Sequence, residues 1–230
     1  MIIGKGMVAS ALKEISGWDD DVIFSSGVSN SGELDQHNYQ REVELVKSYL
    51  TKVKHPASFV YFSTISIFDP SKAENAYIRH KLFIEDLIQN SSVNYLILRL
   101  PNLVGFSKNP NTLTNYFANS IRQNSTIILN AHAIRHLIDV ADLSSILHSI
   151  KNKFGQDQII VNVNTNSPLT ARKIIAWIEV ALKKNAIIQK NLETEDLKIC
   201  NENRFESSLN YQWNINEDYH RKLFMKYYST

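Results

Sequence analysis

A hydroxyl at the end of a strand and a tyrosine–lysine pair on the next helix are the residues best suited to chemistry. Residues 59–62 (FVYF) are apolar and β-branched or aromatic, which predicts a buried strand running into Thr64. A helix predicted over 76–90 carries Tyr77 and Lys81. Residues four apart share one helical face, so the phenol and the ammonium can reach the same place. The arrangement indicates acid–base chemistry on an alcohol or a ketone.

Two loops rich in small residues are candidates for contact with a ligand. Residues 4–9 read G-x-G-x-x-A between a short apolar stretch and a stretch with helical character. Glycines permit a tight turn and close backbone approach, and N–H groups at a helix N-terminus attract a pyrophosphate. The loop 25–31, after a strand predicted at 21–24, also lets a ligand approach the backbone. An ordinary surface turn is the alternative for each loop.

Apolar strands alternate with amphipathic helices in the first half of the chain, which is typical of parallel β-α units. Strands are predicted at 21–24, 59–63 and 94–100, and helices at 38–54 and 76–90. Four residues fall at predicted strand ends: Gly4, Ser25, Thr64 and Asn102. Ligands of such folds bind beyond the carboxyl ends of the strands, so we expect these four residues along one edge of the sheet.

The second half of the chain shows a looser pattern. It predicts helices at 112–123, 143–153 and 170–184, strands at 126–129 and 159–163, an extended stretch at 135–140 and a final helix near 217–228. Asp142 and Thr170 stand where N-caps would begin two of these helices. From about residue 189 to the final helix the sequence is polar and predicts irregular structure.

Composition limits the class of protein. The 230 residues suffice for one sizeable domain, and the net charge of +2, without a basic block, gives no support for nucleic acid or a membrane as partners. The single cysteine, Cys200, excludes an internal disulfide framework. No apolar run could span a bilayer and no signal-peptide core is present, which predicts a cytoplasmic protein. His132 and His136 lack partners at a metal-like spacing, so no metal site is expected.

The chain resembles the extended short-chain dehydrogenases/reductases, in particular the NAD-dependent epimerase/dehydratase group that acts on nucleotide sugars. The matching segments, in family order, are GKGMVA, VIFSSGVSNS, FVYFSTISIFDP, YIRHK, LILRLPNLVG, NPNTL, RHLIDVADL and IVNVNTNSPLT. The resemblance implies an α/β fold: a Rossmann-like parallel sheet with helices on both faces, truncated by about two strands, plus a small C-terminal substrate lobe. It implies a dinucleotide-binding core with the catalytic residues at 1–104, and at 105–230 a substrate-binding lobe mixed with returning core elements.

The same resemblance implies catalytic roles for Thr64, Tyr77 and Lys81. Tyr77 resembles the acid/base of the family. Lys81 resembles the cation that lowers the pKa of this tyrosine and holds the nicotinamide ribose, and Thr64 the hydroxyl that orients the carbonyl or carbinol. Ser63 is the alternative for this last role. A free phenol has a pKa of about 10, so it needs such a cation to react near neutral pH.

Ligand-binding residues are implied as well. The expected cofactor is NAD or NADP, and the choice between them is open. The residues implied to contact it are Gly4, Lys5, Gly6, Met7, Val8, Ser25, Ser26, Gly27, Ser63, Tyr77, Lys81, Leu100 and Pro101. The residues implied to contact a nucleotide-sugar substrate are Ser66, Asn102, Asn111, Leu113 and Arg135. Arginine suits a diphosphate because its planar fork donates hydrogen bonds in pairs.

Two departures from the family pattern matter. The usual chain has two further strands between the glycine turn and the loop at 25–31, and these carry the residue that reads the adenosine ribose. Here only about a dozen residues separate Ala9 from Val22, so the adenosine side is truncated or built from something else. Dehydratases also carry an acidic pair after the catalytic threonine, where this chain has Ile65 and Ser66. A 4,6-dehydratase is therefore not expected.

Together these features predict an NAD(P)-dependent oxidoreductase that reduces a keto group on a nucleotide-linked deoxysugar, in surface polysaccharide precursor synthesis. The alternatives are a nucleotide-sugar 4-epimerase with bound NAD, a reductase of another ketone such as a flavonoid-type or steroid ketone, and a non-catalytic dinucleotide- or nucleotide-binding module. A truncated adenosine side argues against lasting retention of NAD, which ranks the reductase above the epimerase. Helices at 38–54 and 76–90 commonly form the dimer interface of this family, so a homodimer is expected.

Overall fold

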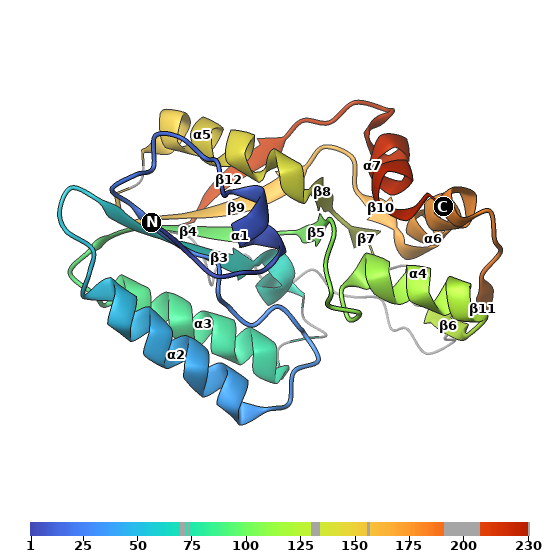
Figure 1. The fold of residues 1–230 in the computed structure, drawn as a ribbon, viewed down its shortest axis with the longest axis horizontal. Helices are drawn as coiled ribbons and strands as arrows, with labels where there is room; N and C mark the ends of the chain where they lie inside the picture. Colours follow the sequence, from blue (N-terminus) through green and yellow to red (C-terminus); the bar gives the residue numbers. More distant parts are fainter. Residues whose placement is uncertain (70–71, 73, 130–133, 156, 191–207, 230) are drawn as a thin grey trace.

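The computed structural model describes residues 1–69, 72, 74–129, 134–155, 157–190 and 208–229 (Figure 1). A six-stranded sheet lies at the centre, in the order β1-β2-β3-β4-β9-β12, and all of its neighbouring strands are parallel. The strands are β1 (Ile2–Ile3), β2 (Val22–Phe24), β3 (Ser58–Thr64), β4 (Asn94–Leu100), β9 (Ile159–Thr165) and β12 (Leu209–Trp213). The predicted Rossmann-like sheet is confirmed, and β1 forms one edge because no described strand lies beyond it.

Helices cover both faces of this sheet. On one face, α2 (Gln36–Leu50) and α3 (Ala76–Gln89) lie side by side and bury Val46 and Ile84 against Phe59. On the other face, α1 (Met7–Ala11) and α5 (Leu143–Phe154) pack over the core that contains Val60 and Leu98. The resulting arrangement of helix, sheet and helix is the predicted α/β class.

A second apolar core gathers the helices of the C-terminal half. It contains α4 (Leu113–Gln123), α6 (Ala171–Leu182) and α7 (Tyr219–Tyr228), together with the parallel pair β6 (Thr126–Leu129) and β11 (Ile187–Lys190). The pairs β5 (Asn102–Val104) with β8 (Leu137–Asp139), and β7 (Ile134–Arg135) with β10 (Leu169–Thr170), lie between this core and the central sheet (Figure 1). Since β9 and β12 return to the central sheet, the division of the chain near residue 104 stays a prediction.

Residues at the N-cap positions mark where three of the helices begin. Asp35 caps α2 by accepting a hydrogen bond from the His37 N–H group. Thr170 caps α6 in the same way, as predicted, by accepting from the Lys173 N–H group. Asp142 precedes α5 as expected, but its side chain makes no cap hydrogen bond.

The Asp142 carboxylate serves the tertiary structure instead. It accepts hydrogen bonds from the Tyr219 hydroxyl of α7 and the Trp213 indole of β12, so it ties both elements to the start of α5. The predicted N-cap position is therefore confirmed, but distant donors take the carboxylate that would otherwise cap the helix.

Two further predictions differ from the structure. The helix after the glycine turn has only five residues and ends at Ala11. The tail predicted to be irregular contains β12, whose residues alternate between half-buried and exposed positions. The polar Asn210 and Gln212 occupy the exposed positions and lower the mean hydropathy of the strand. Composition alone therefore does not predict a strand here. Cys200 and His132 lie outside the described residues.

None of the helices within the described ranges combines the length and apolar character that crossing a bilayer requires.

Gly105 is a site where the packing of the glycine turn can be tested. A Cβ atom on Gly105 would lie 2.4 Å from Val140 Cγ1 and 2.8 Å from Met7 Sδ, the first residue of α1. We expect Gly105→Ala to lower the free energy of unfolding by about 1–3 kcal/mol, because overpacking displaces α1. Urea unfolding followed by circular dichroism measures this change. Gly32→Ala is the control, since its nearest neighbour would be Asn30 Oδ1 at 3.5 Å; equal losses in both variants would contradict the packing argument.

Candidate active site

Thr64 and Tyr77 meet at the carboxyl end of the central sheet. Thr64 is the last residue of β3, and Tyr77 lies in the first turn of α3. The Asn75 side chain caps that turn by accepting hydrogen bonds from the N–H groups of Tyr77 and Ile78. The Thr64 hydroxyl lies close enough to the Tyr77 phenol to act on its pKa. A strand end and a helix cap thus bring together the two hydroxyls that the sequence singles out.

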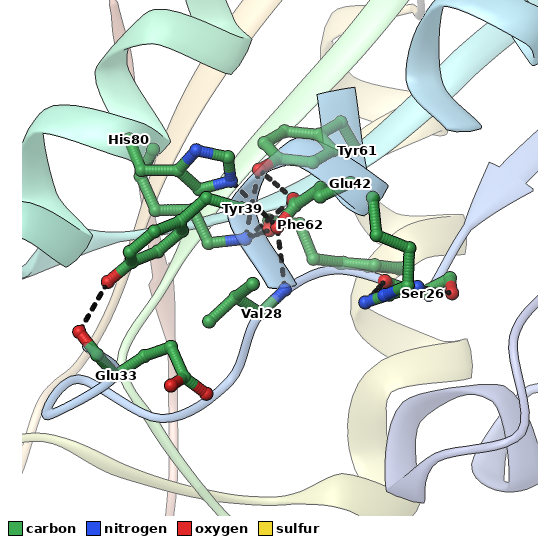
Figure 2. Close-up of polar contacts among 10 residues, drawn as sticks. Ser26, Val28, Glu33, Tyr39, Glu42, Tyr61, Phe62 and His80 are labelled. Atoms are coloured by element: carbon green, nitrogen blue, oxygen red, sulfur yellow. Dashed lines mark hydrogen bonds and ion pairs between the residues drawn. The ribbon is translucent and has the colours of Figure 1, made fainter. Parts of the chain in front are cut away.

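A buried carboxylate, Glu42 of α2, lies beside this pair and gathers four partners (Figure 2). Its Oε1 accepts hydrogen bonds from the Tyr61 hydroxyl at 2.7 Å and from Lys81 Nζ at 3.2 Å. Its Oε2 accepts from the Val28 N–H at 2.6 Å and lies 2.9 Å from His80 Nε2. Burial opposes ionisation, but the Lys81 charge and these hydrogen bonds hold the pKa of Glu42 well below its usual value.

The Lys81 ammonium is fully engaged inside the protein. Besides Glu42 it donates to the Tyr61 hydroxyl at 2.9 Å and to the Phe62 carbonyl at 3.4 Å, which accounts for its three N–H groups. Its Nζ lies 5.8 Å from the centroid of the Tyr77 ring. Contact between Lys81 and a nicotinamide ribose stays a prediction, and it requires the exchange of one of these hydrogen bonds.

The electrostatics of Tyr77 differ from the sequence-based expectation. We expected Lys81 to lower the pKa of this phenol. Instead, burial of the phenol and then the negative charge of Glu42 raise the pKa of Tyr77 above its usual value, although the nearby Thr64 hydroxyl acts in the opposite direction. The expectation fails because burial has the largest effect on this phenol and the Glu42 charge adds to it.

Glu42 is absent from the predicted site residues, yet the sequence holds a signal for it. The buried residues of α2 are Tyr39, Glu42, Val46 and Leu50, which form one helical face. An ionisable side chain in such an apolar stripe needs a partner for its charge. That partner, Lys81, lies 39 positions further along the chain, so local patterns do not reveal the pair.

The glycine turn has the geometry of a phosphate-binding turn. Gly4 has a φ of +133°, and a Cβ there would lie 2.5 Å from the Ser25 carbonyl oxygen, so only glycine fits. Gly6 is the N-cap of α1 and has no atom within 4 Å of where its Cβ would be, so its backbone is open to a ligand. Lys5, between them, is exposed.

Two serine hydroxyls at neighbouring strand ends have no hydrogen-bond partner among the residues that the structure describes. Ser25 follows β2 and Ser63 lies in β3, and the Oγ atom of each is buried and unpaired. Buried polar groups normally find partners, so these hydroxyls suit a bound polar ligand. With the open turn at Gly6, they fit a dinucleotide lying across the strand ends.

The remaining residues predicted to contact the cofactor serve the protein's own packing. Ser26 accepts two hydrogen bonds from Arg41, at its hydroxyl and at its carbonyl. Gly27 lets the ion pair form, because a Cβ there would lie 2.8 Å from Glu42 Oε1 and 2.9 Å from Lys81 Nζ. Four others, all wholly or partly buried, line the ends of α1 and β4: Met7, Val8, Leu100 and Pro101.

The residues predicted to hold a nucleotide sugar are spread over several elements. Asn102 begins β5, and its side chain donates to the His136 carbonyl at 3.4 Å. Asn111 is exposed before α4, and Leu113 is the first residue of that helix. The Ser66 N–H donates to Thr64 Oγ1 at 3.1 Å, which places Ser66 next to the candidate catalytic hydroxyl of Thr64.

Arg135 is half-buried in β7, where its Nη1 donates to the Ile134 carbonyl at 2.9 Å. Sequence reasoning missed its neighbour Lys72. Burial, followed by the like charge of Arg135, lowers the pKa of Lys72, whereas the Asp69 carboxylate, 3.8 Å from Lys72 Nζ, raises it. Because Asp69 pairs with Lys72, Arg135 is the cation of this region that suits a diphosphate.

The sequence model of the NAD dependent epimerase/dehydratase family matches residues 24–163, more than half of the chain. The chain belongs to this family. The resemblance predicted from its motifs is thereby confirmed. No curated protein sequence matches the chain.

Solved structures of similar fold agree with membership of the family. The UDP-glucose 4-epimerase of Thermus thermophilus, in complex with NAD, has a TM-score of 0.63 and 15% identity over 96% of this chain and 80% of its own. RMD of Pseudomonas aeruginosa, complexed with NADPH, gives 0.67 and 14% over 98% and 87%. The dTDP-glucose 4,6-dehydratase of Bacillus anthracis, in complex with NAD, gives 0.58 and 15% over 98% and 77%. At these low sequence identities, the similarity shows that this chain shares the fold of these proteins.

The ion pair makes a prediction about stability and pH. We expect Glu42→Gln to lower the free energy of unfolding at pH 7 by about 3 kcal/mol, because the Lys81 charge stays buried without its counter-charge. The pKa of Glu42 is lower in the folded than in the unfolded chain. The ionised Glu42 carboxylate therefore stabilises the fold above its pKa in the unfolded chain, about 4.3. This stabilisation is lost as the pH falls below that value.

Urea unfolding at pH 7 and pH 3 therefore distinguishes this carboxylate from an ordinary one. The loss in free energy of unfolding that Glu42→Gln causes should be smaller at the lower pH. Glu44→Gln on the same helix is the control, since Glu44 is exposed and contacts only the Gln40 amide. A loss in free energy of unfolding of equal size at both pH values would contradict the assignment of a negative charge to Glu42.

Proposed function

We propose that the protein is an NAD(P)-dependent reductase of a keto group on a nucleotide-linked deoxysugar, acting in surface polysaccharide precursor synthesis. The observation that most supports reduction is the environment of Tyr77. Burial and the Glu42 charge raise its pKa, and Lys81, neutralised by Glu42, does not reverse the effect. A phenol that stays protonated at neutral pH can donate a proton, as reduction of a carbonyl requires. It is a poor base for oxidising an alcohol.

Each residue of the cluster has a role in this proposal. Tyr77 donates its proton to the substrate oxygen, and Thr64, close to Tyr77, helps to orient that oxygen. Lys81 is held in place by Glu42 and Tyr61 and acts as a positioning residue beneath Tyr77. A bound nicotinamide coenzyme would supply the hydride.

The substrate end of the proposal rests on charge. Arg135 provides a cation for the diphosphate of a nucleotide sugar, whereas Lys72 is paired with Asp69 at 3.8 Å. Such an arginine would not be needed for an uncharged ketone of the steroid or flavonoid type. Arg135 therefore favours a nucleotide-linked substrate over those alternatives.

A nucleotide-sugar 4-epimerase is the second candidate, since the epimerase from Thermus thermophilus has the same fold. Epimerisation begins with removal of a proton from an alcohol, and the raised pKa of Tyr77 disfavours that step. A 4,6-dehydratase has less support, because Ile65 and Ser66 supply no carboxylate after Thr64. The contact between Thr64 and Tyr77 favours an enzyme over a binding module.

A homodimer is part of the proposal. Helices α2 and α3 lie side by side on one face of the sheet (Figure 1). Phe83 of α3 exposes 51% of its surface, which is a large fraction for a phenylalanine and suits a contact between subunits.

Substituting Tyr77 tests the proposed chemistry. We expect Tyr77→Phe to lower kcat by a factor of about 10²–10⁴, because the proton donor is lost, while coenzyme binding is kept. Oxidation of NADH or NADPH in the presence of a 4-keto-6-deoxy sugar nucleotide, followed by absorbance, measures the activity. Tyr116→Phe is the control, since Tyr116 is exposed on α4. If the wild-type protein binds these ligands but oxidises neither coenzyme, the binding module becomes the better description.

Retention of the coenzyme separates the reductase from the epimerase. A reductase exchanges its coenzyme in every turnover, whereas an epimerase keeps NAD through oxidation and reduction of one substrate. We expect protein purified by gel filtration to carry far less than one NAD per chain, measured after acid release by chromatography. One NAD per chain would reverse the ranking of the two activities.

A further inference from the structure

The loop 105–112 joins the two halves of the molecule on the proposed substrate side. It runs from β5, next to the central sheet, to α4 of the second apolar core (Figure 1). It carries Asn111, and Leu113 follows it as the first residue of α4. Asn109 of the loop donates from Nδ2 to Ser29 Oγ at 3.4 Å, which connects it to the loop after β2. The groups that hold this loop therefore determine where two of the proposed substrate contacts lie.

Side-chain hydroxyls and amides give this loop its shape. Ser107 Oγ accepts a hydrogen bond from the Asn109 N–H at 3.1 Å, and Asn109 Oδ1 accepts from the Asn111 N–H at 2.9 Å. Asn115 Nδ2, from the first turn of α4, donates to the Asn109 carbonyl at 2.8 Å and to the Ser107 carbonyl at 3.3 Å. The Asn115 amide thus fastens the loop to α4.

The final helix, α7, fixes the orientation of this amide. Backbone carbonyls can only accept, so the NH2 group of Asn115 must face them, and its Oδ1 needs a donor from elsewhere. The Tyr228 hydroxyl lies 2.9 Å from Oδ1 and 2.7 Å from Thr114 Oγ1. A phenol carries one proton, which goes to the amide oxygen because that oxygen has none to give, and Thr114 can donate in return. Tyr228 is therefore the donor on which the Asn115 amide depends.

Burial makes this donor hard to replace. Tyr228 exposes 3% of its surface, and Thr114 beside it exposes 2%. Without the phenol hydroxyl, the Asn115 oxygen would lose its donor at a place that water reaches poorly, and an unpaired amide oxygen there is costly. The amide would then be free to turn, and its two hydrogen bonds to the loop would weaken.

Tyr227, the preceding residue of α7, supports the start of the loop. Its ring meets that of Phe106 edge to face, with the centroids 5.0 Å apart. Its hydroxyl donates to Asp139 Oδ1 at 2.6 Å, at the end of β8. Adjacent tyrosines of one helix thus contact the start of the loop directly and its middle through Asn115.

We infer that Tyr228 and Asn115 are positioning residues of the substrate site: α7, through the Asn115 amide, sets the course of the loop 105–112 and with it the place of a nucleotide sugar. The inference rests on the proposed function, and it adds the C-terminal helix to the elements that determine binding of the substrate. Both residues act through the loop and not on the reacting atoms, so their substitution should affect KM for the sugar nucleotide rather than kcat or binding of the coenzyme. The alternative is a purely structural role, because Tyr228 also packs in the second apolar core.

Tyr228→Phe tests the inference, because it removes the hydroxyl and keeps the ring that packs in the core. The substrate probe is 4-keto-6-deoxyglucose linked to dTDP or UDP, whichever the wild-type protein reduces. We expect KM for this probe to rise about tenfold, since one buried hydrogen bond that holds the loop is lost. Both kcat and the dissociation constant of NADH should stay within about twofold of the wild type. Tyr116→Phe is the matched control, since Tyr116 is exposed on the same helix as Asn115 and should change none of these values.

A double variant shows whether Tyr228 acts through Asn115. Asn115→Ala should raise KM at least as much as Tyr228→Phe does. If the two residues form one chain of hydrogen bonds, adding Tyr228→Phe to Asn115→Ala raises KM little further, because the hydroxyl no longer has an amide to orient. Multiplied effects in the double variant would overturn the inference, since they mean that the two residues act independently.

Hydrogen exchange measured by mass spectrometry gives a readout without catalysis. We expect peptides covering residues 105–112 to exchange about fivefold faster in Tyr228→Phe than in the wild type, because the loop protects the N–H groups of Asn109 and Asn111 only while it keeps its shape. Peptides covering β3 should not change. Unchanged exchange in the loop overturns the inference, whether or not the protein is a reductase. Faster exchange with an unchanged KM leaves only a structural role, which also overturns it. If the wild-type protein oxidises neither coenzyme with either sugar nucleotide, the proposed function is overturned, and the positioning of such a substrate with it.

Discussion

The buried ion pair between Glu42 and Lys81 fixes how the elements around the active site can be arranged. It joins α2 to α3, and through Tyr61 and Val28 it joins both helices to β3 and to the loop after β2. Two charges without water are costly, by several kcal/mol each, unless hydrogen bonds satisfy them completely. Here all three ammonium donors and both carboxylate oxygens have partners. The loop must carry Gly27 where it passes the pair, because any side chain there would collide with the charged atoms.

The ion pair also links the chemistry to the truncated sheet. A neutralised Lys81 leaves the Tyr77 phenol protonated, which suits one-way donation of a proton to a carbonyl. A sheet that ends at β1 provides less protein around the far end of a dinucleotide than a sheet with further strands would. Both features favour a coenzyme that arrives reduced and leaves oxidised. They come from different parts of the chain, so their agreement supports a reductase more strongly than either does by itself.

Features encoded over short spans of sequence were predictable, and features that depend on distant partners were not. The β3–α3 unit follows from an apolar run and a helical repeat, so Thr64 and Tyr77 could be placed together in advance. Glu42 could not, because its role depends on a lysine 39 residues away and on burial that only the assembled layers create. The side chain of Asp142 is a similar case: its N-cap position was predictable, but Tyr219, 77 residues further on, takes its carboxylate. In each case the deciding hydrogen bond is long-range.

The open edge of the sheet has to be protected from pairing. An exposed strand edge invites pairing with another chain, and proteins avoid this with short edge strands and nearby charges. Strand β1 has two residues, and the charged residues Lys5, Lys13 and Asp19 lie near it. These charges oppose the approach of an apolar strand. The shortened sheet therefore ends in an edge that resists pairing with another chain.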